Sequence, residues 1–540
     1  MITMIIMASA LIIPSAGQAN VIFVGGDVSG VWDADSVIVG DSIFVSPGNS
    51  LEIEPGTDVI FLAAFSFRIY QDAVLRAIGT ESDMISFRPA LQGYSSLGID
   101  FEGASDESIM EYCHITHALY SAIALTDCNI TIRNCLLEDN PGYYRGGGIS
   151  ALEGSDALIE NNIIRNNTTN QSGGGIYCNA SSPTIRGNLI DGNSSGPIAQ
   201  GGGISCSNHS HPLIVNNTFT NNEVTPSPVF PATQGQGAAI YCSNISEPTI
   251  IGNLFLNNRV NNGGESGQYG GGAIFVFSAA PIIENNVFAG NVTEYGSGGA
   301  LYLFIFTGSL VNNVFYNNSA LNYGGAVYMD LSDPTVTNSI FYNNSAGTGS
   351  EFYLDRSSTV NVSYSDIEGG WEGDGNIDAD PMFRDPAGND YHLMAIECGD
   401  PYDSPCIDAG NPVINDSLLD CSWGLGTVIS DLGAYGGADS AAVDIYTPQA
   451  AVPGRYSLAQ NYPNPFNAAT TIKYELPNQA HVTLEILDVL GRKVKTITDG
   501  LQQSGYHQVI WNAGDVSSGV YFYKIQAGEY SESRKMILIK

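Results

Sequence analysis

The sequence predicts an all-β protein, in which a parallel β-helix solenoid is followed by a small antiparallel β-sandwich. Three observations lead to this prediction. A segment of about 27 residues recurs between residues 146 and 367, and self-similarity at such a period indicates a solenoid. The apolar segments within it are short and bounded by Gly, Asn, Ser and Pro, and none has the 3.6-residue period of a helix. After residue 455 the repeat stops, and longer alternating segments begin.

The repeat contains two blocks, both visible in GGGIYCNASSPTIRGNLIDGN (173–193). The residues just before each apolar segment lie 27, 28, 36, 34, 27, 26 and 25 positions apart, namely Gly148, Gly175, Gly203, Ala239, Ala273, Ala300, Ala326 and Glu351. The second block ends in asparagine each time, at Asn167, Asn193, Asn222, Asn258, Asn291, Asn318 and Asn344. The two long intervals predict loop insertions at 222–236 and 258–269.

The recurring asparagine favours stacked turns for two reasons. Asparagine tolerates the left-handed backbone conformation, and its amide can hydrogen-bond to the same amide one coil away. A lone coil buries too little to offset the entropy of ordering it, whereas stacked coils pair every strand above and below. We therefore expect Asn258, Asn291 and Asn318 to form one column along the solenoid.

Charge divides the chain unevenly. Of 19 basic and 55 acidic residues, nine and seven lie in 451–540, which leaves 10 basic and 48 acidic residues in 1–450, or about −38. Such a body repels phosphate backbones, so nucleic acid is excluded as a partner. The apolar start MITMIIMASALIIPSAGQAN predicts a signal peptide over 1–19, with Gly17 and Ala19 before the cleavage site; a buried first strand is the alternative. No later stretch is long enough for a membrane span, so none is expected in the mature protein.

Residues of about 40–440 resemble the right-handed β-helix proteins of the pectin-lyase-like superfamily. The opening coils that carry this resemblance are LEIEPGTDVIFL (51–62) and LRAIGTESDMISF (75–87), and the closing ones are GDGNIDADPMF (373–383), SPCIDAG (404–410) and DLGAYGG (431–437). The resemblance implies a right-handed solenoid. It leaves function open, because the superfamily includes lyases, hydrolases and adhesins.

Residues 456–540 resemble the C-terminal sorting domain of type IX secretion substrates, which has an immunoglobulin-like fold. The resemblance rests on five segments in order: YSLAQNYPNPFNAATTIKYELP (456–477), HVTLEILDVLGRKVKTI (481–497), GYHQVIWNA (505–513), SSGVYFYKIQAG (517–528) and SRKMILIK (533–540). Ala468 departs from the proline usual in the family. The resemblance implies type IX-like secretion machinery as a partner and an extracellular or outer-membrane surface location. A permanent accessory sandwich is the alternative.

Strand alternation assigns side chains to the two faces of each coil. In GGGIYC, Ile176 and Cys178 point inward and Tyr177 points outward. Cys178, Cys206 and Cys242 share their position with plain hydrophobic residues, so we expect buried thiols that fill space. We expect the same of Cys113, Cys128 and Cys135. Cys398, Cys406 and Cys421 lie in loop-rich sequence, where two of them are expected to form a disulfide.

The outward position of the same segment carries an aromatic residue in five successive coils. These residues, predicted to bind a ligand, are Tyr241, Phe275, Tyr302, Tyr328 and Tyr353. Rings about 4.8 Å apart match the repeat of a sugar chain, so a glycan is the predicted ligand. The alternative is a stack of rings that only stabilises the fold.

The sequence offers one weak constellation for catalysis and one for a metal. Asp330 and Asp355 are expected to be neighbours beside Arg356, and the superfamily resemblance implies that polysaccharide lyases use stacked carboxylates and a basic side chain in this way. The loop EGDGNIDAD spaces oxygen ligands for calcium at Asp374, Asn376, Asp378 and Asp380, although the distal Glu of an EF-hand is missing. No cofactor is required. The histidines, among them His392, have no nucleophile partner in the sequence.

The predicted organisation is a signal peptide (1–19), a cap with the first coils (20–145), regular coils (146–367), closing coils and loops (368–445), a linker (446–455) and the sorting domain (456–540). The predicted function is binding of a glycan or another surface component without catalysis. The alternatives are a polysaccharide lyase or hydrolase and a structural spacer.

Overall fold

The computed structural model describes residues 20–437, except 92–94, 197–199, 226–234, 262–268 and 417, and residues 456–539, except 459–460, 462–463, 468, 479, 490, 503–504, 515 and 529. The chain divides into two compact units, Met1–Ser440 and Ala441–Lys540. The predicted signal peptide, the linker at 446–455 and most of both predicted loop insertions lie outside the described residues.

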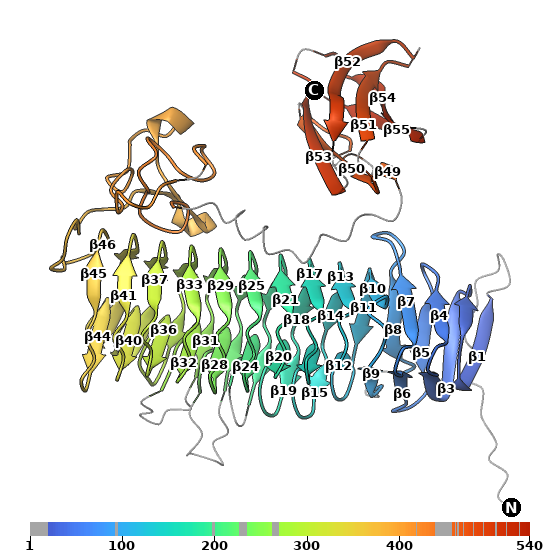
Figure 1. Ribbon diagram of the computed structural model, residues 1–540, viewed down its shortest axis with the longest axis horizontal. Helices are drawn as coiled ribbons and strands as arrows, with labels where there is room; N and C mark the ends of the chain where they lie inside the picture. Colours follow the sequence, from blue (N-terminus) through green and yellow to red (C-terminus); the bar gives the residue numbers. More distant parts are fainter. Residues whose placement is uncertain are drawn as a thin grey trace, which may run out of the picture. The chain divides into compact units, whose positions relative to one another are not determined.

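The first unit is a right-handed β-helix, as predicted, with its coils stacked from β1 (Val21–Asp27) to β46 (Asp366–Ile367) (Figure 1). Each regular coil has three main strands and a short fourth one, and each strand pairs in parallel with its counterparts in the next and previous coils. We number the four columns of strands in the order in which a regular coil passes through them. The first and third columns join at the N-terminal end through the long strand β3 (Ser36–Val45), which pairs with β1, β5 and β6.

The columns have the following strands. The first column is β6 (Ser66–Ile69), β9 (Gly98–Glu102), β12 (Ile123–Thr126), β16 (Ile149–Leu152), β20 (Ile176–Asn179), β24 (Ile204–Ser207), β28 (Ile240–Ser243), β32 (Ile274–Phe277), β36 (Leu301–Phe304), β40 (Val327–Asp330) and β44 (Phe352–Asp355). The second is β2 (Gly30–Trp32), β4 (Ser50–Ile53), β7 (Val74–Ile78), β10 (Ile109–Glu111), β13 (Thr131–Arg133), β17 (Leu158–Glu160), β21 (Thr184–Arg186), β25 (Leu213–Val215), β29 (Thr249–Ile251), β33 (Ile282–Glu284), β37 (Ser309–Val311), β41 (Thr335–Thr337) and β45 (Asn361–Ser363). The third is β5 (Asp58–Phe61), β8 (Ile85–Pro89), β11 (Cys113–Thr116), β14 (Leu136–Glu138), β18 (Ile163–Arg165), β22 (Leu189–Asp191), β26 (Thr218–Thr220), β30 (Leu254–Leu256), β34 (Val287–Ala289), β38 (Val314–Tyr316), β42 (Ile340–Tyr342) and β46. The fourth is β15 (Pro141–Gly142), β19 (Thr168–Thr169), β23 (Ser194–Ser195), β27 (Glu223–Val224), β31 (Arg259–Val260), β35 (Val292–Thr293), β39 (Ser319–Tyr323) and β43 (Ser345–Thr348).

The core of the solenoid is one continuous apolar column. Ile176 and Cys178 point into it and are fully buried, as alternation predicts. Cys206 pairs in register with Cys178 and Cys242, so the three thiols stack one per coil. Hydrogen bonding to the Cys206 thiol, together with burial, raises the pKa of Cys178. Cys113, Cys128 and Cys135 are also buried and free, so the prediction of space-filling thiols is confirmed.

The predicted asparagine column is present. Asn258 Nδ2 donates to Asn291 Oδ1 at 3.0 Å, and Asn291 Nδ2 donates to Asn318 Oδ1 at 2.9 Å. The backbone N–H of Asn258 also donates to Asn291 Oδ1, and Asn258 Nδ2 donates to the carbonyl of Phe219. The same pattern continues from Asn140 to Asn344. We call this series the asparagine ladder.

One part of that prediction was wrong. A single asparagine was expected to take the left-handed conformation and to form the ladder, but two adjacent residues divide these tasks. Asn257 has a φ of 55°, whereas the ladder residue Asn258 does not take positive φ. Gly192 and Gly290 occupy the position equivalent to Asn257 in other coils. The left-handed position therefore accepts glycine, because glycine takes positive φ without a steric penalty.

A second ladder, which the sequence reasoning missed, lies between the second and third columns. Asn188 Nδ2 donates to Asn217 Oδ1 at 2.9 Å, and Asn217 Nδ2 donates to Asn253 Oδ1 at 3.0 Å. The series runs from Asn162 to Asn313. The signal was present, because each second block also begins with Asn-Asn, Gly-Asn or Asn-Ser. Both corners are thus held by buried amides whose polar groups are satisfied.

The asparagine ladder ends on a buried carboxyl. Asn344 Nδ2 donates to Glu351 Oε2 at 2.7 Å, and Glu351 is only 6% exposed. Burial raises the pKa of Glu351 to about 7, although the Asn344 amide opposes this shift. The folded-state pKa lies above the unfolded value, so the carboxyl is most favourable to folding at low pH, and stability is lost as the pH rises from about 4 through about 7.

Glu351→Gln is therefore expected to stabilise the solenoid at pH 8, by about 2–3 kcal/mol, and to change little at pH 5. Thermal unfolding followed by circular dichroism at both pH values measures this. Glu372→Gln, which alters an exposed carboxylate, is the matched control. An equal change in the unfolding temperature of the Glu351 variant at both pH values would show that ionisation of this carboxyl does not affect stability.

After β46 the chain folds back along the solenoid. We call residues 368–437 the closing segment; it contains β47 (Phe383–Asp385), η1 (Pro386–Gly388), β48 (Asp390–Leu393) and η2 (Ile396–Cys398). Its apolar side chains pack on the outward face of the third column, against residues that include Leu256, Val314 and Ile340. Three left-handed asparagines of successive coils, Asn285, Asn312 and Asn338, donate side-chain N–H groups to residues 430–436.

The second unit is an antiparallel β-sandwich, as predicted. One sheet contains β49 (Ser457–Leu458), β50 (Ala469–Leu476) and β53 (Gly505–Asn512). The other contains β52 (Lys493–Gln502), β51 (Ala480–Leu487), β54 (Gly519–Ala527) and β55 (Tyr530–Leu538), in that order. The core between them includes Tyr474, Trp511 and Tyr523.

Candidate functional site

The predicted aromatic residues form a single stack. Tyr241, Phe275, Tyr302, Tyr328 and Tyr353 are in register in five successive coils. The ring centroids of Phe275 and Tyr302 are 4.7 Å apart, and those of Tyr302 and Tyr328 are 4.6 Å apart. The predicted column of rings outside the core therefore exists, and we call it the aromatic stack.

The exposure expected of this stack is corrected by the structure. Phe275 is 0% and Tyr302 1% exposed, and Tyr241 and Tyr328 are also buried. The cause lies at the adjacent corner, where the Tyr269 ring packs on Phe275 and Tyr302, and the Tyr323 ring packs on Tyr328 and Tyr353. Only Tyr353 at the end of the stack is partly exposed. Four of the five rings are thus enclosed within the protein rather than presented to a glycan.

The predicted catalytic residues are brought together but bind one another. Asp330 and Asp355 are register partners, and Arg356 Nε lies 3.3 Å from Asp330 Oδ1. Asp355 Oδ2 accepts a hydrogen bond from the Tyr328 hydroxyl at 2.7 Å. Burial raises the pKa of Asp330, which Arg356 opposes and Asp355 reinforces. Asp330 is therefore paired with Arg356, and Asp355 with the Tyr328 hydroxyl.

The predicted calcium ligands do not converge either. Asp378 accepts the N–H of Gly369, and Asp380 accepts the N–H of Met382. Asn376 accepts the N–H of Ser365 and donates to the Val362 carbonyl. Asp374 is exposed. In the described residues, no group of three or more His, Cys, Asp or Glu side chains could hold a metal ion.

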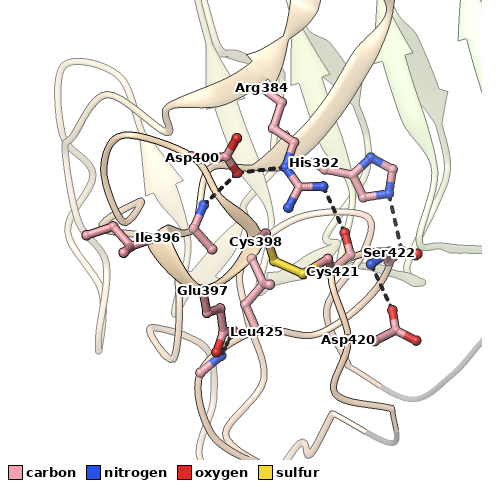
Figure 2. Close-up of a disulfide and its surroundings, with 12 residues drawn as sticks. Arg384, His392, Ile396, Glu397, Cys398, Asp400, Asp420, Cys421, Ser422 and Leu425 are labelled. Carbon is pink, nitrogen blue, oxygen red and sulfur yellow. Dashed lines mark hydrogen bonds and ion pairs between the residues drawn. A yellow bond between two sulfur atoms is a disulfide. The ribbon is translucent and has the colours of Figure 1, made fainter. Parts of the chain in front are cut away.

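The closing segment is held by one disulfide, between Cys398 and Cys421 (Figure 2). This resolves the pairing that the sequence left open. Cys406 is free and buried, with its Sγ 3.4 Å from Asp366 Oδ2. Beside the disulfide, Arg384 donates to Asp400 at 2.9 Å and to the carbonyl of Cys421 at 2.8 Å (Figure 2). The part of the closing segment around Arg384 and Cys398 is therefore cross-linked to the part around Cys421, both covalently and by hydrogen bonds.

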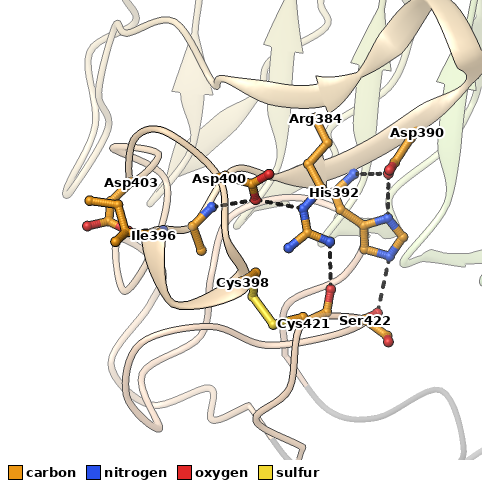
Figure 3. A network of polar contacts seen from close by, with 10 residues as sticks. Arg384, Asp390, His392, Ile396, Cys398, Asp400, Asp403, Cys421 and Ser422 are labelled. Carbon is orange, nitrogen blue, oxygen red and sulfur yellow. Dashed lines mark hydrogen bonds and ion pairs between the residues drawn. A yellow bond between two sulfur atoms is a disulfide. The ribbon is translucent and has the colours of Figure 1, made fainter. Parts of the chain in front are cut away.

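A polar network extends this cross-link (Figure 3). His392 Nδ1 lies 2.6 Å from Asp390 Oδ1, and its Nε2 lies 3.2 Å from the Ser422 carbonyl. The N–H of Ile396 donates to Asp403 at 2.8 Å. The His392 ring is therefore held by contacts within the closing segment. The hydrogen bond from Ile396 to Asp403 fixes the loop that carries Tyr402.

Other residues of the closing segment form one side of a cleft of about 400 Å³, and the third column of the solenoid forms the other. Tyr316 and Tyr342 come from β38 and β42, at equivalent positions of successive coils. The closing segment contributes the remaining residues, which are Asp380, Pro381, Met382, Phe383, Pro386, Met394 and Tyr402. We call this the tyrosine cleft.

The cleft combines fixed apolar walls with polar groups at its mouth. Tyr316 is held edge-on against Phe383, with ring centroids 5.7 Å apart. The N–H of Met394 donates to the Met382 carbonyl at 2.9 Å, which fixes the two methionines relative to each other. Burial raises the pKa of Tyr342, and the nearby Asp380 carboxylate adds to the effect. Tyr402 is 64% exposed. An aromatic cleft with few polar groups is typical of small-ligand sites.

Sequence reasoning missed this cleft, although a signal exists. The last outward position of the third column is Glu138, Arg165, Asp191 and Thr220 in the earlier coils, and Leu256, Ala289, Tyr316 and Tyr342 in the later ones. A change from charged or polar to apolar residues at a fixed outward position indicates that this face is covered in the later coils. Which segment covers it cannot be read from the repeat.

Family comparisons assign the two units. The model for the right-handed β-helix region matches residues 97–296, and the model for the secretion system C-terminal sorting domain matches residues 460–540. This is a right-handed β-helix protein with a C-terminal sorting domain. The sorting domain implies secretion to the cell surface or the extracellular space. A short match at 314–330 is to the Chlamydia polymorphic membrane protein repeat. Within the described residues, no helix has the length and apolar character to cross a membrane.

No curated protein matches the chain. One solved structure that resembles part of it is PorZ of Porphyromonas gingivalis, an essential bacterial surface component of the type-IX secretion system. The identity is 25% over 17% of this chain and 13% of PorZ, with a TM-score of 0.12. An alginate lyase from Paenibacillus sp. covers 58% of this chain and 93% of its own, with 11% identity and a TM-score of 0.17. At these TM-scores, neither similarity bears on the function of this chain.

Proposed function

We propose that this secreted β-helix protein binds a glycan in the tyrosine cleft and does not cleave it. The observation that carries the proposal is the convergence of Tyr316, Tyr342 and Tyr402 on one cleft between the solenoid and a cross-linked closing segment. Aromatic faces pack against the C–H groups of sugar rings, and tyrosine hydroxyls suit a hydrated ligand. The sorting domain would deliver this site to the cell surface or the medium.

Charge narrows the class of glycan. Asp380 lines the cleft, and the first 450 residues have a net charge of about −38. A polyuronate would be repelled by both, whereas a neutral or amine-bearing sugar would not. We therefore propose a neutral or amine-bearing glycan.

The test is a glycan array probed with the full chain, followed by calorimetry on the best oligosaccharide. Tyr342→Ala is expected to weaken binding at least tenfold, about 1.4 kcal/mol, because the ring loses its contact with the sugar. Tyr295→Ala, which removes a half-buried tyrosine outside the cleft, is the matched control and should bind as the wild type does.

Two outcomes would contradict the proposal. A blank array would favour the structural spacer. Formation of unsaturated products from polyuronates, detected by absorbance and lost in Asp330→Ala, would favour the lyase.

A further inference from the structure

A second group of aromatic side chains lies on the outside of the early coils. Tyr120, Tyr143 and Tyr144 are 43%, 52% and 55% exposed. The rings of Tyr120 and Tyr144 are nearly parallel, with an interplanar angle of 13° and centroids 5.9 Å apart. Tyr143 meets Tyr144 edge-on at 4.8 Å. Single exposed aromatic residues are common, but here Tyr144 contacts both of the other rings, and the three form a patch. We call it the tyrosine platform.

The backbone beneath the platform is fixed by the neighbouring coils. The N–H of Tyr143 donates to the Leu119 carbonyl at 2.9 Å, and Thr169 Oγ1 donates to the Tyr144 carbonyl at 2.9 Å. Arg145 forms a β-bridge with Ser172. The platform is therefore built on the solenoid and is in place before any ligand arrives.

In the later coils, tyrosines at the corner before the first column have a structural role. There, Tyr269 and Tyr323 pack down on the aromatic stack. In the coils of the platform, the outward position that carries the stack is occupied by Ala124 and Ser150. No ring lies at that position in these two coils. The ring of Tyr177, at the same position in the next coil, is covered by Arg145, so packing on the stack does not account for the clustering of the platform tyrosines.

Arg145 follows Tyr144 in the chain, and its side chain is held in place by residues of the next coil. Its guanidinium carbon lies 5.1 Å from the centre of the Tyr177 ring, and its Nε donates to Gln171 Oε1 at 3.3 Å. A guanidinium has five N–H donors in a fixed plane, so the bond from Nε uses only one of the donors that Arg145 could offer to sugar hydroxyls.

We propose that the tyrosine platform is a second glycan site, which binds a neutral polysaccharide chain by stacking sugar rings on Tyr120 and Tyr144. The acidic body disfavours anionic membranes, nucleic acid and polyuronates alike. A second copy of the chain has the same charge, and three rings offer far less than the roughly 800 Å² per partner of a stable protein interface. A neutral glycan needs only the aromatic faces and a few donors. This site does not depend on the tyrosine cleft.

The test is affinity electrophoresis of the full chain in native gels that contain dextran, laminarin, xyloglucan or galactomannan. All variants carry Tyr342→Ala, which removes the contribution of the cleft. We expect at least one polysaccharide to retard this parent, and Tyr120→Ala with Tyr144→Ala to weaken that retardation at least tenfold. Tyr120→Phe with Tyr144→Phe keeps both rings and should stay within about twofold of the parent.

The outcomes separate the two sites. Retardation of the wild type that disappears with Tyr342→Ala alone would place all binding in the cleft and overturn this proposal. No retardation by any of the four polysaccharides would also overturn it, as would equal retardation of the parent and the double alanine variant. If thermal unfolding shows that the alanine variant is destabilised, Tyr120→Ser and Tyr144→Ser are made singly, and retention of full binding by both would again overturn it.

Discussion

Asn258→Ala is expected to lower the free energy of unfolding of the solenoid by about 3–5 kcal/mol. The substitution removes the shared acceptor of the N–H and Nδ2 groups of Asn222, and the donor to the carbonyl of Phe219. All of these groups are buried, and each one left without a partner costs about 1–3 kcal/mol. Chemical denaturation of the full chain, followed by circular dichroism, measures the loss.

The adjacent residue provides the control. Asn257 has positive φ, and Gly192 and Gly290 occupy its position in other coils. Asn257→Gly should therefore change stability by less than about 1 kcal/mol, since glycine takes this conformation freely. Similar losses for the two variants would mean that the ladder contributes no more than the turn, and a loss below 1 kcal/mol for Asn258→Ala would contradict the account of the ladder.

The contrast between Asn257 and Asn258 also shows how far sequence reasoning reaches. The period of the repeat predicted that the asparagines would stack, because every coil places the same position above the last. The pattern could not assign the left-handed conformation to one of two adjacent positions, since asparagine suits both tasks. The coils in which Gly replaces the first residue, such as Gly192-Asn193, contained the information needed.

The aromatic stack shows a different limit. Alternation along a strand correctly placed Phe275 and Tyr302 outside the core of the coil. It could not predict what lies over them, because the covering residues Tyr269 and Tyr323 come from a corner whose direction the strand pattern does not set. The alternation of side chains along a strand determines which face a residue lies on. It does not determine whether other residues cover that face.

The tyrosine cleft depends on contacts that no local pattern contains. Asn285 donates to the carbonyls of Ala434 and Gly436, about 150 residues further along the chain. The closing segment has little regular structure, so neither period nor propensity predicts its path. It returns to the third column because the later coils present an apolar face there, and the disulfide and the Arg384–Asp400 ion pair hold its arms together.

Burial of the aromatic stack predicts the second large effect. Tyr302→Ala is expected to lower the free energy of unfolding by about 3–5 kcal/mol, because it leaves a cavity between Phe275 and Tyr328 and removes two ring contacts. Tyr402→Ala makes the same chemical change at a side chain that is 64% exposed, so its effect on stability should stay below about 0.5 kcal/mol. Chemical denaturation compares the two.

Binding measurements on the same pair should give the opposite order. Tyr402 lines the tyrosine cleft and Tyr302 does not, so Tyr402→Ala should weaken glycan binding while the solenoid keeps its stability. Tyr302→Ala, studied below its unfolding transition, should retain glycan affinity within about threefold, because the stack and the cleft lie over different columns of the solenoid. If Tyr302→Ala abolished binding without lowering stability, the stack would be accessible in solution, and the binding surface would lie over the first column rather than the third.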